Sequence, residues 1–155
     1  MYVRTYQSGD CQALAALFFH TVHTVNARDY TPAQLAAWAT GTVNLEDWNR
    51  SFLEHDTRVA QSGGVICGFA DMDADGYLDR LYVAASHQGQ GIATALLSAL
   101  EQHALAAGVT RFSTHASITA KPFFEKRGYQ VVRENRVVRG EVTLTNFVMV
   151  KPTTP

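Results

Sequence analysis

The sequence has no excess of basic residues. Its 155 residues include 13 lysines and arginines and 14 aspartates and glutamates, which gives a formal net charge of −1 at pH 7. Proteins that bind nucleic acids usually carry a basic excess or a basic stripe. The Lys/Arg cluster from Lys121 to Arg127 is interrupted by "PFFE", which favours the solvated face of a helix. We therefore expect no nucleic-acid partner.

Long apolar runs are also missing, and cysteine is scarce. No run approaches the roughly 18–20 apolar residues that a membrane-spanning helix needs, and "MYVRTYQSGD" at the start lacks the apolar core of a signal peptide. The two cysteines, Cys11 and Cys67, fall in a helical pattern and a strand pattern. We expect ordinary reduced thiols, no membrane association and a cytoplasmic location.

Complete metal and nucleotide motifs are absent as well. His20 and His23 lie three residues apart on one predicted helix, but no third ligand has suitable spacing, so we expect no metal. The segment "DMDADG" (71–76) matches the opening of a calcium loop. Its twelfth position is Tyr82 instead of glutamate, and strand patterns flank it, which predicts a hairpin turn. The P-loop and dinucleotide-binding fingerprints also fail on their specific residues.

What the sequence does contain is a regular succession of strand and helix patterns. The length and the 46% hydrophobic content predict one domain with a real core over residues 1–155. The predicted order is β-α-α-α-β-β-β-α-β-α-β-β. This order gives an α/β (α+β) fold, with a mixed, mostly antiparallel sheet of about seven strands and about four to five helices. Parallel pairing should join strand 77–83, through its helix, to strand 110–117.

The helix ends carry local signals. Ser8 or Asp10 is the predicted N-cap of a helix over 11–25. "YTPAQLAAWA" places Thr31 as N-cap, Pro32 in the first turn and Gln34 in a capping box. The other predicted elements are strands 2–7, 57–61, 65–72, 129–140 and 141–152, and helices 44–55, 91–107 and 119–128.

Two glycines one residue apart, Gly89 and Gly91, open the amphipathic helix 91–107. The first amides of a helix have no partner within the helix, and the helix dipole places partial positive charge there. Glycines without Cβ atoms let a bulky anion reach these amides. Neither this loop nor this helix contains lysine or arginine, so a phosphate would be held by backbone N–H groups and by Gln88 and Gln90.

The stretch Gln88-Gly89-Gln90-Gly91-Ile92-Ala93 fits the pattern Q/R-x-x-G-x-G/A. With the preceding strand "LDRLYV", it resembles the GNAT superfamily of N-acetyltransferases, which bind the pyrophosphate of acetyl-CoA at this loop. The segment "FFEKRGYQ" resembles the family's closing Y-E-K-x-G-F element, and the order of elements is similar over nearly the whole chain. "SITAKPFFE" and "YTPAQLAAWA" together resemble a branch of small bacterial GNAT proteins, a resemblance that names no substrate.

The resemblance implies acetyl-CoA as cofactor. In GNAT proteins the strand equivalent to 77–83 carries a β-bulge and splays from its neighbour, and freed backbone groups pair with the pantetheine arm. Here Leu81, Tyr82 and Val83 would supply those groups, and a backbone N–H would polarise the acetyl carbonyl. The other cofactor-binding residues that the resemblance implies are Gln88, Gly89, Gln90, Gly91, Ile92, Ala93, Thr94, Ser117, Ala120 and Phe124.

Acetyl transfer to an amine needs a proton acceptor, because an alkylamine with a pKa of about 10.4 is mostly protonated at pH 7. Tyr77 and Asp79 share a face by strand alternation, and Asp79 is the predicted general base, directly or through water. The alternative for Asp79 is a salt bridge with Arg80 or Arg136. His115 is a second candidate, for which the alternative is a partly buried histidine with satisfied hydrogen bonds.

The chain departs from the family at the acid that protonates the leaving thiolate. Many GNAT proteins read N-x-x-A-x-x-x-Y where this chain reads "SITAKPFF" (117–124), so Phe124 replaces the tyrosine. Departure of an unassisted thiolate, from a thiol with a pKa near 8.5, costs roughly 2 kcal/mol at neutral pH. Ser117, Tyr82 or water would have to supply the proton, and we expect slow to moderate chemistry.

The acceptor pocket is predicted from the early helices, with His23, Tyr30 and Trp38 as candidate contacts and core packing as the alternative for the aromatics. The leading hypothesis is an acetyl-CoA-dependent N-acetyltransferase that acetylates a primary amine of a small molecule by direct attack. One alternative is an acyl-CoA-binding sensor or pseudoenzyme, which Phe124 favours. Another is an enzyme that acetylates a protein or an aminoacyl-tRNA, although the missing basic patch argues against RNA.

The final strand raises the question of a homodimer. Its apolar segment "LTNFVMV" (144–150) would suit pairing across a dimer, and an internal position in the sheet explains it equally well.

Overall fold

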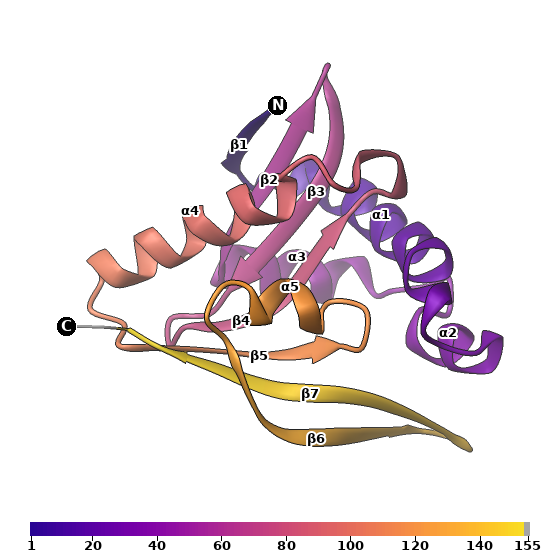
Figure 1. The fold of residues 1–155 in the computed structure, drawn as a ribbon. Coiled ribbons are helices and arrows are strands. Elements are labelled where there is room, and N and C mark those ends of the chain that lie inside the picture. Colours follow the sequence, from indigo (N-terminus) through magenta and orange to yellow (C-terminus); the bar gives the residue numbers. More distant parts are fainter. Residues whose placement is uncertain (154–155) are drawn as a thin grey trace.

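Strands and helices follow one another in the predicted order in this computed structural model, which describes residues 1–153 (Figure 1). The strands are β1 (Tyr2–Thr5), β2 (Asp56–Ser62), β3 (Val65–Met72), β4 (Tyr77–Val83), β5 (Arg111–Ser117), β6 (Gln130–Arg139) and β7 (Val142–Pro152). The α-helices are α1 (Cys11–Thr24), α2 (Pro32–Trp38), α3 (Leu45–Glu54), α4 (Ile92–Ala106) and α5 (Lys121–Glu125). Short 3₁₀ turns occupy Ser8–Asp10, Asn26–Arg28 and Ala85–His87.

The seven strands form one sheet in the order β1-β2-β3-β4-β5-β7-β6. All neighbouring pairs are antiparallel except β4 and β5, which run parallel. The mixed sheet and its single parallel pairing confirm the predicted fold class. The suggestion that "LTNFVMV" pairs across a dimer is wrong, because this segment belongs to β7 and lies between β5 and β6.

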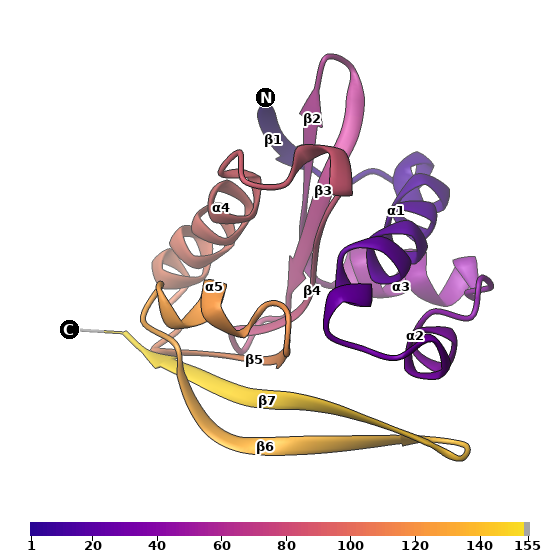
Figure 2. The same cartoon turned by 45° about the vertical axis from the view of Figure 1, so that its right-hand side comes forward.

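Helices cover both faces of the sheet (Figure 2). On one face, α1, α2 and α3 enclose a cluster of buried side chains that includes Leu14, Phe52 and Phe69. On the other face, α4 and α5 enclose a second cluster that includes Leu96 and Phe112. Both clusters arise from apolar spacing that turns one stripe of each helix toward the sheet. No helix in residues 1–153 has the length and apolar content needed to cross a bilayer.

The helix starts follow their local signals in one case and not in another. At α2, Thr31 Oγ1 accepts the Gln34 N–H at 3.2 Å and Gln34 Oε1 accepts the Thr31 N–H at 2.9 Å, so the capping box is confirmed. Of the two N-caps predicted for the first helix, Asp10 does occupy the N-cap position of α1, but its side chain caps no amide of that helix, and Ser8 lies in a 3₁₀ turn over Ser8–Asp10. Asp10 turns back to Arg4, whose two terminal nitrogens lie 2.8 and 2.9 Å from it, because a guanidinium is the stronger partner.

Some predicted boundaries also shift by a few residues. The helix predicted over 119–128 is α5, with only Lys121–Glu125 helical, since Pro122 and Gly128 restrict its two ends. The "DMDADG" segment is the predicted turn, and Asp73 Oδ1 accepts the N–H groups of Asp75 and Tyr77, each at 2.9 Å.

Gly76 fixes the start of β4 against β5. Its φ is +90°, and a Cβ there would lie 2.6 Å from the Arg111 carbonyl oxygen, so only glycine fits. The Ser113 N–H donates to the Gly76 carbonyl at 3.1 Å. The two strands therefore begin side by side.

Candidate active site

β4 contains one residue more than its pairing with β3 requires. Met72 pairs with Leu78, but the next residue of β3, Asp71, pairs with Arg80, so Asp79 has no partner in this ladder. Such a bulge bends the strand and increases its twist. The bulge expected in strand 77–83 is present, at Asp79.

β4 and β5 separate directly after this bulge (Figure 2). They pair only at Tyr77–Ser113 and Leu78–Thr114. Beyond these residues β4 remains paired with β3, while β5 remains paired with β7. The β5-facing side of β4 from Asp79 to Val83 therefore has no partner strand, which confirms the expected split.

Two cavities open at this split. The loop-side cavity, of about 350 Å³, lies among β4, the end of β5 and the starts of α4 and α5. The hairpin-side cavity, of about 440 Å³, lies among β4, the aromatic side chains of α2 and α3, and the β6–β7 hairpin. Both are lined by Trp38, Asp79, Arg80, Tyr82, His115 and Ser117. The cavities therefore meet at the bulge, and a group on Asp79 is available to both.

The loop-side cavity gathers most of the predicted cofactor contacts. Its walls include Leu81, Tyr82, Val83, Gln88, Ala93, Ser117, Ala120 and Phe124. These residues come from β4, the loop after it, α4, β5 and α5, so the split sheet brings together segments that are up to forty-odd positions apart in the sequence. The predicted residues Gly89, Gln90, Gly91, Ile92 and Thr94 lie on the loop and in the first turn of α4.

The loop itself presents open backbone. Gly89 and Gly91 have φ values of +74° and +81°, in the left-handed region that favours glycine, and a Cβ at either position would meet no atom within 4 Å. Gly91 is the N-cap of α4 and offers no side chain to its first amides. Ile92 buries its side chain in the core, so only its backbone faces the loop. This arrangement suits an anion that approaches from outside.

One predicted phosphate contact is engaged elsewhere. The Gln88 side-chain amide donates to the Val83 carbonyl at 2.7 Å, which ties the end of β4 to the loop. The structure therefore assigns its side chain to the loop's own support, while Gln90 is exposed.

A guanidinium that the sequence analysis missed reaches α4 from the end of α5. Arg127 donates to Thr94 Oγ1 in the first turn of α4 and to the Phe123 carbonyl at 3.1 Å, and its guanidinium carbon lies 3.9 Å from the centre of the Phe123 ring. Among residues 1–153, Arg127 Nε and Thr119 Oγ1 are buried side-chain atoms without a hydrogen-bond partner. The loop and the helix contain no lysine or arginine of their own, and the fold supplies a guanidinium to this helix start from 33 positions away.

Asp79 stands on the wall shared by both cavities. Its side chain is 39% exposed, and one of its oxygens lies 3.5 Å from Arg80. Burial and the neighbouring Asp71 carboxylate raise the pKa of Asp79, while the Arg80 charge opposes the shift. The alternative of an ion pair with Arg80 is therefore present, while the role of Asp79 as general base stays a prediction for a carboxylate that lines both cavities.

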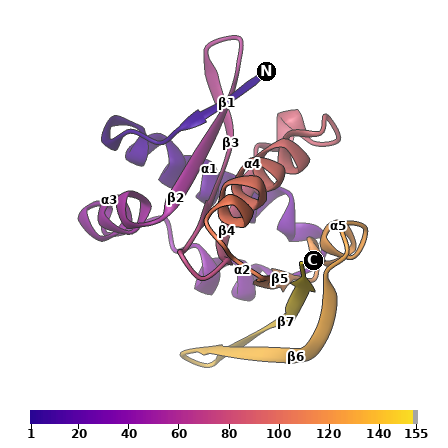
Figure 3. The same cartoon turned by 90° about the vertical axis from the view of Figure 1, so that its left-hand side faces the viewer.

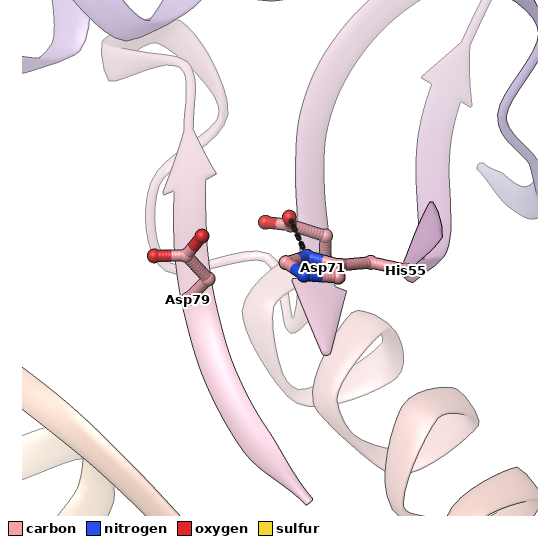
Figure 4. A group of neighbouring side chains, drawn as sticks. All are labelled: His55, Asp71 and Asp79. Atoms are coloured by element: carbon pink, nitrogen blue, oxygen red, sulfur yellow. Dashed lines mark hydrogen bonds and ion pairs between the residues drawn. The ribbon is translucent and has the colours of Figure 1, made fainter. Parts of the chain in front are cut away.

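Arg80 has a stronger partner than Asp79. Asp71 is fully buried and accepts two hydrogen bonds from Arg80, at 3.0 and 2.6 Å, and one from His55 Nδ1 at 2.8 Å. Figure 4 shows the His55–Asp71 contact, with Asp79 on the neighbouring strand. The Arg80 guanidinium also lies 4.3 Å from the centre of the Phe52 ring. The cluster of His55, Asp71 and Asp79 has metal-binding atom types, but the cation already bound to both Asp71 oxygens opposes a metal ion there.

The remaining catalytic candidates surround Asp79. Tyr77 and His115 pack edge to face, with ring centres 5.5 Å apart, and both line the hairpin-side cavity. Burial, with the negative charge of Asp79, raises the pKa of Tyr77 to about 12. Burial raises the pKa of Tyr82 above its usual value as well. Ser117 Oγ accepts the Ala120 N–H at 3.0 Å and supports the turn into α5.

Phe124 lies in the wall of the loop-side cavity, at the position where the family pattern has a tyrosine. Its ring is 3% exposed and lies 5.2 Å from the rings of both Phe123 and Tyr129. Tyr129 directs its hydroxyl to Glu101, at 2.6 Å. The α5 wall therefore contributes packing and no acidic proton at this point.

The predicted acceptor contacts separate into two groups. Tyr30 and Trp38 line the hairpin-side cavity, with ring centres 5.2 Å apart. The Tyr30 hydroxyl donates to the Thr145 carbonyl at 2.7 Å and accepts the Ile118 N–H at 2.9 Å, so it also joins three segments. His23 is not brought to either cavity: its Nε2 lies 2.8 Å from the Ala39 carbonyl and its ring packs on Phe19. Its placement in the acceptor site is corrected accordingly, because α1 turns that side chain toward α2.

Comparison with known proteins decides the family. The family model of the acetyltransferase (GNAT) domain matches residues 26–151. The chain belongs to the GNAT superfamily. The matched GNAT domain includes the glycine loop and most of the elements that line both cavities, among them β4, β5, α4 and the β6–β7 hairpin.

Individual GNAT relatives match nearly the whole chain. The uncharacterized N-acetyltransferase YafP of Escherichia coli (strain K12) is 34% identical over 147 residues, covering 95% of this chain and 93% of YafP. A crystal structure of a GCN5-related N-acetyltransferase from Rhodopseudomonas palustris has 32% identity and a TM-score of 0.92, covering 97% of this chain and 94% of that chain. The paia N-acetyltransferase of Thermoplasma acidophilum, solved in complex with coenzyme A, has 16% identity and a TM-score of 0.80, with 97% and 98% coverage.

Within this GNAT domain, sequence reasoning missed Arg127, His55 and Asp71. Asp71 had a usable signal, since a carboxylate in the apolar strand "VICGFADM" requires a buried partner. Arg127 and His55 had none, because their contacts depend on how α5 and the end of α3 meet distant strands.

Proposed function

We propose that this chain is an acetyl-CoA-dependent N-acetyltransferase that acetylates a primary amine of a small molecule by direct attack. The observation that carries the proposal is the junction of two cavities at Asp79, one beside the open glycine loop and one lined by aromatic side chains. A donor and an acceptor that enter from opposite sides of the split would meet beside this carboxylate. The paia relative, solved with coenzyme A, supports the choice of cofactor.

The residues of the loop-side cavity fit coenzyme A. Free amides at the start of α4, with the open glycine loop, suit a diphosphate. Arg127 would add positive charge, and the unpartnered Arg127 Nε and Thr119 Oγ1 offer further hydrogen bonds. The unpaired side of β4 at Leu81–Val83 suits an extended arm that hydrogen-bonds like an added strand. When bound, acetyl-CoA supplies an activated thioester.

Asp79 is the proposed general base. The acceptor would arrive as an ammonium ion and lose its proton to the Asp79 carboxylate, directly or through water, before attack. Burial and the neighbouring Asp71 charge raise the pKa of Asp79, which makes its carboxylate a stronger base. His115 lines the same cavities and remains the second candidate.

Tyr82 is the proposed proton donor for the leaving thiolate, in place of the tyrosine that Phe124 replaces. It lines both cavities, and its raised pKa keeps its hydroxyl protonated at neutral pH. Ser117 is the alternative donor on the β5 side of the split. Backbone N–H groups of β4 without a β5 partner would polarise the acetyl carbonyl.

The hairpin-side cavity fits a small amine with an apolar body. Its walls include the rings of Tyr30, Trp38, Trp48, Tyr77 and Tyr82. Aromatic faces attract ammonium groups, and Asp79 is the carboxylate among the lining residues. A volume of about 440 Å³ admits a small molecule or the end of a peptide.

A thiol-release assay with acetyl-CoA and a panel of primary amines tests the proposal. We expect amine-dependent release that Gly91→Glu abolishes, because its carboxylate would stand over the helix amides in open space. Gly91→Ala is the matched control, since it introduces the same left-handed strain without the charge and should retain most of the affinity.

A second candidate function is an acyl-CoA-binding sensor with little catalysis. The apolar Phe124 in the cavity wall favours it, because no phenolic proton is available there. Tight binding of acetyl-CoA with no amine-stimulated release, across amines and peptide N-termini, would support the sensor over the enzyme.

A further inference from the structure

The outermost strand of the sheet has an unpaired edge. β6 spans ten residues and pairs only with β7 among residues 1–153, and Figure 3 shows no element beyond it. One row of its backbone N–H and C=O groups therefore faces outward. Proteins usually protect a long edge strand with charged side chains, proline, a bulge or a covering segment. β6 contains no proline or lysine, its bulge is confined to Val132, and its charged residues are three arginines and one glutamate.

The exposed side chains of β6 have a symmetrical arrangement. Val132 and Val138 are 57% and 69% exposed, which makes them unusual for large apolar residues. Between them lie Glu134 and Arg136, which face the same side and come within 3.5 Å of each other. Asn135 stands at the centre of the charged pair.

The part of β6 that contains these charges is regular. From Arg133 to Arg139 each residue pairs with successive residues of β7, and only Val132 is left out of this ladder. A regular, twisted strand of this length presents alternating backbone groups at its free edge and can accept a further strand.

We propose that β6 pairs with β6 of a second copy of this chain, antiparallel, about a two-fold axis at Asn135. In this register Glu134 lies opposite Arg136 of the partner subunit, and the second copy repeats the contact. Arg133 lies opposite Val137 of the partner subunit. The exposed Val138 comes beside Val132 of the partner subunit, so the apolar side chains that are exposed in one copy cover each other in two.

The charges select this axis over its neighbours. In an antiparallel pair, opposed residues have the same backbone phase, so a two-fold axis falls on a residue. An axis at Glu134 would oppose two glutamates. An axis at Arg136 would oppose two copies of Arg136 and would place Arg133 opposite Arg139 of the partner subunit. Like charges directly opposite are destabilising, whereas opposite charges stabilise the pair.

This assembly goes beyond the proposed activity but lies next to the site. Val137 and Arg139 of β6 line the hairpin-side cavity. Pairing of β6 would hold this wall of the cavity in place, and it would leave the loop-side cavity open at the opposite end of β4.

Sedimentation velocity over a concentration series tests the dimer and its charges. We expect a monomer–dimer equilibrium in which Glu134→Arg or Arg136→Glu raises the dissociation constant about tenfold, because each substitution acts twice across the axis. The double variant with both substitutions restores opposite charges and should return the dissociation constant close to that of the wild type. This rescue separates the proposed pairing from a general loss of stability.

Disulfide cross-linking tests the axis. Asn135→Cys places two thiols face to face and should give a cross-linked dimer on mild oxidation, since Cys11 and Cys67 are buried. Val138→Cys is the matched control: its two copies would lie about 20 Å apart along the strands, so it should not cross-link with itself. A mixture of the Val132→Cys and Val138→Cys proteins should cross-link.

A chain that remains monomeric throughout the series overturns the proposal, including the case in which its edge binds a different protein. A dimer whose dissociation constant is unchanged by both charge reversals, and which forms no disulfide with Asn135→Cys, overturns it as well. In that case another surface must hold the two copies together.

Discussion

At the scale of single residues, Asp79 carries two properties that point in opposite directions. It is the unpaired residue of the β4 bulge, and its carboxylate faces both cavities. Its raised pKa means that the folded protein holds this proton more tightly than the unfolded chain does. Ionised Asp79 therefore costs stability at neutral pH, while the proposed reaction requires it ionised.

Asp79→Asn should lower kcat by about a hundredfold or more, the usual contribution of a general base. In the wild type, kcat/KM should fall as pH falls through the raised pKa of Asp79, and the variant should lack this limb. The measurement is the pH dependence of kcat/KM for one amine, in the wild type and in the variant. Urea unfolding at neutral pH is the control, and the variant should be as stable as the wild type or more so. An unchanged pH profile would assign the base elsewhere, with His115 next.

Arg127→Ala should weaken binding of coenzyme A about ten- to a hundredfold, the value of a charge-assisted hydrogen bond to phosphate. Arg127→Lys keeps the charge but loses the guanidinium fork, so it should restore part of the affinity. Isothermal titration measures both variants. Arg111→Ala, at an exposed position at the start of β5, is the matched control and should bind like the wild type. Equal affinities for all four proteins would remove Arg127 from the site.

At the scale of elements, the end of α3 is tied to β3 and β4 by a buried network. His55 follows α3 directly and hydrogen-bonds to Asp71 in β3, which also binds Arg80 in β4. The hydrogen bond to Asp71 raises the pKa of His55 above 6.5, although burial opposes it. A raised histidine pKa adds stability that is fully present below 6.5 and is lost as pH rises through the folded-state pKa.

His55→Gln should remove this pH dependence. The wild type should have a higher urea midpoint below pH 6.5 than well above it, and His20→Gln, whose imidazole is exposed on α1, is the matched control that should keep this difference. His55→Gln should show a smaller difference between the two conditions. If the variant and the wild type keep the same difference, the His55–Asp71 contact contributes nothing to the pH response.

The helices and strands were more predictable from the sequence than the contacts between them. Strand 77–83, its parallel partner and the α2 capping box follow from alternation, from the crossover rule and from Thr31–Gln34 spacing, all of which are local. The start of α1 at Cys11 was predicted correctly, but the Asp10 side chain does not cap the helix, because Arg4, on another element, binds the Asp10 carboxylate. Of the site, the glycine loop and Asp79 could be found in the sequence. Arg127 at Thr94 and His55 at Asp71 could not, because no local pattern encodes contacts 33 and 16 positions apart.

At the scale of the whole molecule, the sheet is nearly divided. β1–β4 form one half and β5–β7 the other, and only two residue pairs join them in a ladder. Each half has its own paired strands, so the boundary between them is the place where backbone groups exchange most readily with solvent. A ligand that bridges the boundary should therefore make the halves behave as one unit.

Saturating coenzyme A should slow hydrogen exchange at Leu81–Val83 and in the first turn of α4, while the β2–β3 hairpin should exchange as before. At a hundred times its dissociation constant the ligand should also add about 2.7 kcal/mol to the free energy of unfolding. Exchange mass spectrometry with and without coenzyme A measures the local effect, and Gly91→Glu is the control that should show none. Slowing spread evenly over the chain would indicate general stabilisation instead of a bridge.

The extra residue in β4 also decides which layer each later side chain enters. Side chains alternate between the two faces of a regular strand, and the bulge shifts this alternation by one residue, so Leu78 points into the layer of Leu96 while Arg80, two positions later, points toward Trp48. In a strand of the same length without the bulge, with Leu78 still opposite Met72, Arg80 and Tyr82 would enter the layer of Leu96 and Leu81 would turn toward Trp48. Deletion of Asp79 would remove the bulge and its carboxylate but leave these side chains in their present layers, because Arg80 would then follow Leu78 directly.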